Sequence, residues 1–144
     1  MTAALPQIAA RVFLHQQRAA QRKVDADEWT RAEGDRRLAP WAATASLAGA
    51  DLPFLRKAIA DEQTPDNVTV ISGEWTPPTE AEARERIARD YASPREWHAV
   101  LARALQAARD RDPNGEIAGL LTVLTVALQV PVTARPREPE RIAA

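Results

Sequence analysis

The sequence predicts a single all-α domain, a compact bundle of five or six helices within residues 1–130. Apolar side chains recur every three or four residues along much of the chain. Residues that favour helix beginnings precede several of these runs. One run, residues 115–130, is apolar around nearly its whole circumference, as in a buried helix. A chain of 144 residues is long enough to bury such a core without disulfides.

The composition excludes several classes of function. There is no cysteine, which rules out disulfides, thiolate catalysis and cysteine metal sites. A formal net charge of −1 gives no general reason to expect nucleic acid or an anionic membrane as partner. Only Lys23 and Lys57 of the 19 basic residues are lysines, and alanine is abundant, as in proteins of GC-rich bacterial or phage genomes. The N-terminus lacks the pattern of a signal peptide, so a cytoplasmic protein is expected.

The first helix is expected over residues 5–23, with an apolar stripe on one side. Its basic side chains recur at steps of four, three and four residues and therefore share another face. That face would either contact phosphates or an acidic partner, or be the solvated side of an amphipathic helix. The second interpretation is favoured. The residues are Arg11, His15, Arg18 and Arg22.

Residues 25–35 are highly charged and contain one aromatic side chain, Trp29. Asp25 or Asp27 is suited to cap a short helix here, and Gly34 to end it. An indole in polar surroundings is either part of the core or an anchor for a protein partner. The sequence favours neither interpretation over the other.

Two more short helices are expected on either side of the sequence AGAD. The first covers residues 41–48, with Pro40 in its first turn, and Asp51 caps the second, which runs to about residue 62. The pair resembles a helix-turn-helix, with small, glycine and apolar residues at Ala45, Gly49, Leu55 and Ala58. The resemblance implies that Arg56 and Lys57 face a DNA major groove. Any close pair of helices also needs small residues and a glycine turn.

Residues 64–78 interrupt the helical pattern. A short β-prone run lies between Val68 and Ile71, with turn residues on both sides. It is expected to form one strand, a small hairpin, or a loop held by Trp75. As a protruding loop it would suit protein recognition, with Trp75 as a second candidate anchor. As a wing after the helix-turn-helix it would favour DNA binding.

The second half of the chain carries the clearest local signals. Thr79 with Glu82, and Ser93 with Glu96, form capping boxes that begin helices reaching to about residues 91 and 111. A turn at residues 112–115 should fold the second of these back, antiparallel, on a central helix over residues 116–130. A homodimer is expected if one apolar face of that helix is not covered within the chain. Residues 131–144 should be an extended or disordered tail.

No catalytic or metal-binding pattern is evident. The two histidines have no suitable carboxylate spacing, and the five glycines are isolated. The sequence therefore favours a non-enzymatic protein-binding accessory or regulatory factor, of adaptor or inhibitor type and phage-like origin, with no cofactor and no membrane partner. A helix-turn-helix DNA-binding regulator is the alternative, and an enzyme is least favoured. The candidate protein-binding residues are Trp29 and Trp75, and the candidate nucleic-acid residues are Arg11, Arg18, Arg22, Arg56 and Lys57; Trp41 and Trp97 are expected in the core.

Overall fold

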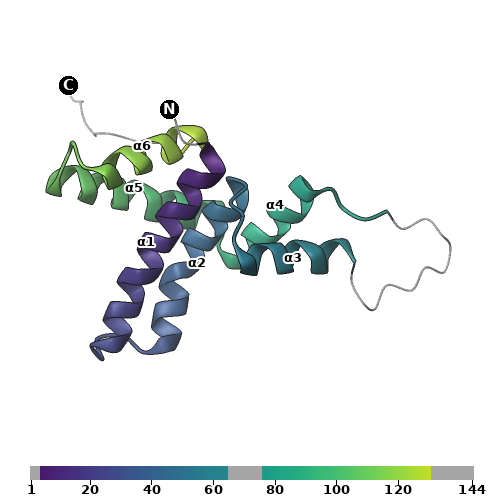
Figure 1. Ribbon diagram of the computed structural model, residues 1–144, viewed down its shortest axis with the longest axis horizontal. Coiled ribbons are helices and arrows are strands. Elements are labelled where there is room, and N and C mark those ends of the chain that lie inside the picture. The colour runs from purple at the N-terminus through teal and green to yellow at the C-terminus, as the bar shows by residue number, and fades with distance from the viewer. Residues whose placement is uncertain (1–3, 65–75, 131–144) are drawn as a thin grey trace, which may run out of the picture.

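The chain forms six helices and no strand within the residues that the computed structural model describes, 4–64 and 76–130 (Figure 1). This confirms the all-α prediction. The β element expected near residues 68–71, Trp75 and the tail over residues 131–144 lie outside the described residues. The helices are α1 (Leu5–Asp25), α2 (Arg31–Leu47), α3 (Pro53–Gln63), α4 (Glu80–Tyr91), α5 (Pro94–Arg111) and α6 (Glu116–Ala127).

Helix α2 is the centre of the fold. Six consecutive residues, 41–46, are buried, so this part of the helix is covered on all sides. Four of them are alanine or serine, and these small side chains allow α1, α4 and α5 to approach α2 closely. From this meeting point the α1–α2, α3–α4 and α5–α6 pairs extend in three directions (Figure 1). The divergence of the first and third pairs creates the cleft described below.

Helix α6 is therefore not the central helix, contrary to the expectation from its apolar sequence. It packs on α1 and α5 through one face, where Leu121 and Leu124 are fully buried. On its outer face Val123 is 44% exposed and Val126 is 73% exposed. A helix that is apolar around its whole circumference is buried on all sides only when enough other helices surround it. In this fold α2, and not α6, occupies the centre of the bundle. No helix of the described ranges is long and apolar enough to cross a membrane.

The prediction of separate short helices over residues 25–48 was also wrong, because α2 is continuous through Gly34 and Pro40. It is capped by Thr30, whose hydroxyl accepts a hydrogen bond from the Glu33 amide at 3.1 Å. Gly34 permits close packing, since a Cβ there would lie 3.1 Å from Val24 on α1. Pro40 removes one helical hydrogen bond, and packing on several sides retains the helix despite that loss.

The local signals of the second half are confirmed. Thr79 and Glu82 form reciprocal hydrogen bonds of 2.9 and 3.1 Å, and Ser93 and Glu96 do the same at 2.9 and 3.2 Å. Helices α5 and α6 pack as the expected antiparallel pair. Trp41 and Trp97 are buried as predicted.

Helices α1, α2 and α6 end in the same backbone motif, with a residue of positive φ after the last turn. At the end of α2 this residue is Gly49, with φ of 83°, and the next amide, of Ala50, bonds to the Ala45 carbonyl at 3.0 Å. The same motif, with Gln129 at the positive-φ position, ends α6 at Ala127, three residues earlier than predicted.

Gly49→Ala is expected to lower the free energy of unfolding by about 1–2 kcal/mol, because a Cβ is disfavoured at positive φ. Gly119→Ala is the matched control, since Gly119 lies inside α6 and an added Cβ would meet no atom within 4 Å beyond its own stretch of helix. That substitution should stabilise the protein by about 0.5–1 kcal/mol. Urea unfolding followed by circular dichroism measures both, and equal effects of the two changes would contradict the left-handed turn at Gly49.

Candidate functional site: a basic cleft around Trp29

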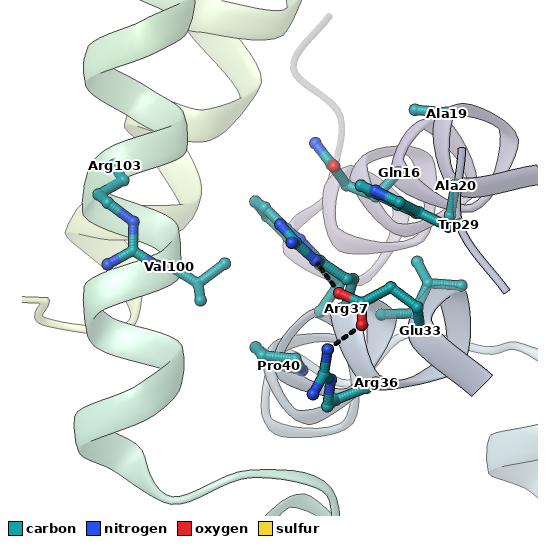
Figure 2. A pocket seen from close by; sticks show the side chains of 12 residues that line it. Gln16, Ala19, Ala20, Trp29, Glu33, Arg36, Arg37, Pro40, Val100 and Arg103 are labelled. Carbon is teal, nitrogen blue, oxygen red and sulfur yellow. Dashed lines mark hydrogen bonds and ion pairs between the residues drawn. The ribbon is translucent and has the colours of Figure 1, made fainter. Parts of the chain in front are cut away.

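A cleft of about 480 Å³ lies between the α1–α2 hairpin and α5 (Figure 2). Its base contains the buried ring of Trp41 and the ring of Pro40. Residues from three helices and one connection contribute to it. They are Gln16, Ala19 and Ala20 of α1, Trp29 of the connection, Glu33, Arg36, Arg37, Leu38, Pro40 and Trp41 of α2, and Val100 and Arg103 of α5.

Trp29 is positioned by the two helix ends that flank it. Its amide donates to the Lys23 carbonyl at the end of α1, and the next residue caps α2. An apolar side chain at this place usually packs on the fourth residue of the following helix, which here is Gly34. With no side chain at Gly34, the half-buried indole lies over the guanidinium of Arg37 instead, with 4.8 Å from Cζ to the ring centroid.

A carboxylate lies between two arginines on the first turns of α2. Glu33 accepts a hydrogen bond from Nε of Arg37 at 2.6 Å and pairs with Nη2 of Arg36 through its other oxygen (Figure 2). The three residues are three and four positions apart, so the helix places them on one face. Glu33 is only 22% exposed, whereas Arg36 and Arg37 are 72% and 59% exposed. Glu33 thus holds two guanidinium groups at the cleft while leaving them accessible.

The cleft is more basic than the chain as a whole. Arg103 of α5 supplies a third cation across from α2 (Figure 2). With Glu33 as the one acidic residue of the lining, its formal charge is +2, against −1 for the whole chain. Such local concentration of charge raises the local concentration of anionic groups and the rate at which they associate.

The predicted basic residues divide between α1 and α3, and on α1 Arg11, His15 and Arg18 line one small pocket beside α6. Arg11 of α1 pairs with Glu116 of α6, while Arg18 and Arg22 are exposed farther along α1. On α3, Arg56 pairs with Asp51 at 2.7 Å, and Lys57 pairs with Asp61 at 3.3 Å. None of these five candidates lines the cleft.

The segment that resembles a helix-turn-helix has the expected glycine turn at Gly49. However, α3 packs chiefly on α4, and α2 packs on α1, α4 and α5. A DNA-reading pair places its second helix against the first and inserts it into the major groove. Packing on α4 and ion pairs at both basic side chains give the DNA interpretation little added support, and it stays a prediction.

Of the residues that sequence reasoning singled out, the structure places Trp29 in the cleft. Glu33, Arg36, Arg37 and Arg103 were missed. A continuous helix from Thr30 would have shown the first three on one face, at the spacing of ion pairs. No local signal in the sequence relates Arg103 to them.

The structure shows no other arrangement that indicates chemistry within the described ranges. No group of three or more histidine and acidic side chains is placed there to bind a metal ion. His98 is half-buried beside the ring of Trp97, at 4.2 Å between centroids. Comparisons with protein-family models, curated proteins and solved structures find no match to this chain.

Proposed function

We propose that this protein is a small cytoplasmic accessory or regulatory factor that acts by binding a partner protein, in the manner of an adaptor or inhibitor. The observation that carries the proposal is the cleft around Trp29. Tryptophan and arginine are the residues most enriched among those that dominate binding energy at protein interfaces. Here a half-buried indole and three arginines line one concave surface.

The size and lining of the cleft support a protein ligand. A volume of about 480 Å³ accommodates a few side chains of a docking segment. Trp41, Pro40 and Val100 supply apolar lining for an apolar side chain, and the arginines supply directional hydrogen bonds. The arginine-rich and alanine-rich composition favours a phage or other mobile element of a GC-rich host as the source.

Trp29→Ala is expected to weaken partner binding by about 2 kcal/mol or more, roughly thirtyfold, because it removes the aromatic anchor and the support for Arg37. Affinity capture from a host lysate with the wild type and the variant, followed by quantitative mass spectrometry, identifies proteins that depend on Trp29. The matched control is Tyr91→Ala, since Tyr91 is a 39% exposed aromatic residue outside the cleft. The proposal fails if no captured protein is lost with Trp29→Ala and retained with Tyr91→Ala.

A further inference from the structure

We infer that the cleft binds an acidic segment of the partner protein, whose carboxylates bond to Arg36, Arg37 and Arg103 while a neighbouring apolar side chain packs on Trp41. This inference rests on the proposed function and specifies its ligand. It follows from the charge of the cleft, the hydrogen-bond donors of its arginines and the apolar surface beneath them.

Electrostatic complementarity favours an anionic ligand. The lining carries a formal charge of +2 in a chain of net charge −1, so a carboxylate gains more from these arginines than a neutral or basic group does. Planar guanidinium groups bond carboxylates through two parallel hydrogen bonds. The contact of Glu33 with Arg36 and Arg37 shows that both guanidinium groups already bind a carboxylate in this structure.

Most of the donors remain for a ligand. Each guanidinium has five N–H donors. Glu33 engages Nε of Arg37 and Nη2 of Arg36, which leaves both terminal nitrogens of Arg37 and the outer edge of Arg36. Arg103 has no ion-pair partner in the described part of the chain. A segment with two acidic residues would use donors on both sides of the cleft.

The same lining argues against a nucleic acid. A phosphate backbone is a closely spaced series of charges that is matched by a continuous basic surface, whereas the three arginines here share the lining with Glu33 and with apolar residues. Trp41, Pro40 and Val100 make part of the lining apolar, which phosphates and sugars do not match. An acidic peptide satisfies both parts, because one short segment can carry carboxylates for the arginines and an apolar side chain for the apolar lining.

The test uses the full-length protein and a dye-labelled peptide of alternating glutamate and leucine, with fluorescence anisotropy as the readout. A peptide with glutamine in place of glutamate has the same shape without charge. Labelled single-stranded and duplex DNA of random sequence are the further probes. The glutamate peptide should bind about tenfold or more tightly than the glutamine peptide, the difference expected for one charge-assisted hydrogen bond.

Arg103→Glu and Arg95→Glu make a matched pair on α5. Both residues are exposed and both substitutions change the net charge equally, yet only Arg103 lines the cleft. Arg103→Glu should weaken glutamate-peptide binding by about tenfold, and Arg95→Glu by less than about twofold at physiological salt, where distant exposed charges are screened. Circular dichroism checks that both variants are folded.

Three results would overturn the inference. They are equal binding of the glutamate and glutamine peptides, equal losses in the two α5 variants, and DNA binding that is tighter than peptide binding and is lost with Arg103→Glu. If a partner is captured through Trp29 and yet the glutamate peptide shows no preference, the proposed function stands and the acidic ligand is wrong. If the glutamate peptide binds at the cleft and no captured protein depends on Trp29, it is the proposed function that fails.

Discussion

Leu124→Ala is expected to lower the free energy of unfolding by about 2–5 kcal/mol, whereas Val126→Ala should change it by no more than about 0.5 kcal/mol. The two residues are two positions apart on α6, and both changes remove methyl groups. Leu124 is fully buried against the neighbouring helices, so its truncation leaves a cavity. Val126 is 73% exposed, so its truncation removes little packing. The difference measures directly which side of α6 is covered.

Urea unfolding at several protein concentrations measures both variants. Similar losses would mean that the outer face of α6 is covered as well, and the homodimer expected from the sequence would then be the explanation. In that case the unfolding midpoint of the wild type would also rise with protein concentration, because association stabilises the folded state by mass action. A concentration-independent midpoint together with a small effect of Val126→Ala would leave α6 as a helix with one covered face in a monomer.

Features set by a few adjacent residues could be predicted from the sequence. The capping boxes at Thr79 and Ser93 place helix beginnings correctly because each is a hydrogen-bonded arrangement of four consecutive residues. The pairing of α5 with α6 follows from the short turn between them, because consecutive helices joined by a short connection pack antiparallel. Gly49 was recognised as a turn residue for the same local reason.

The position of each helix in the fold could not be predicted in this way. Helix α6 has the most apolar sequence and lies at the periphery, while the more polar α2 is central. Small residues such as Ala43 and Ser46 carry little hydropathy signal, yet they allow the closest approach of other helices and are completely buried. Glycine and proline disfavour the interior of a helix. The helix α2 nevertheless continues through Gly34 and Pro40, because its packing against other helices stabilises the helical conformation there.

Of the candidate site, only Trp29 could be predicted from the sequence. Trp29 is noticeable as an aromatic side chain in a charged segment. Dividing that segment at Gly34 placed Glu33 and Arg37 on different elements, so their ion pair was not foreseen. Arg103 lies 66 positions beyond Arg37 and joins the site only because α5 packs against α2. Such a relation is a property of the tertiary structure alone.

Arg84 connects α4 to the C-terminal end of α2 and should be the most important charged residue for stability among those described. Its Nη1 donates to the carbonyls of Ser46 and Ala50, each at 3.1 Å, and its Nε pairs with Glu80 at 2.9 Å. The Ser46 hydroxyl donates in return to the Arg84 carbonyl at 2.9 Å. The Arg84 side chain is only 12% exposed. It therefore bonds to two backbone carbonyls where α2 ends and the connection to α3 begins, and that of Ser46 also accepts a hydrogen bond from the Gly49 amide at 3.2 Å.

Arg84→Ala is expected to lower the free energy of unfolding by about 2–4 kcal/mol, since hydrogen bonds to a charged group contribute about 1.5–3 kcal/mol each and are not additive. The matched control is Arg86→Ala on the same helix, because Arg86 is 61% exposed and lies 3.6 Å from Glu62. That change should cost at most about 1 kcal/mol. Both are measured by urea unfolding.

Arg84→Lys distinguishes geometry from charge at this position. Lysine keeps the positive charge but offers one compact donor group, which cannot reach two carbonyls and Glu80 in the way that a guanidinium does. It should therefore recover only part of the stability lost in Arg84→Ala. Full recovery would show that charge alone matters here. Because Arg84 lies outside the cleft, the glutamate peptide should bind folded Arg84→Ala as tightly as wild type, and a weaker affinity would mean that the two ends of α2 are coupled.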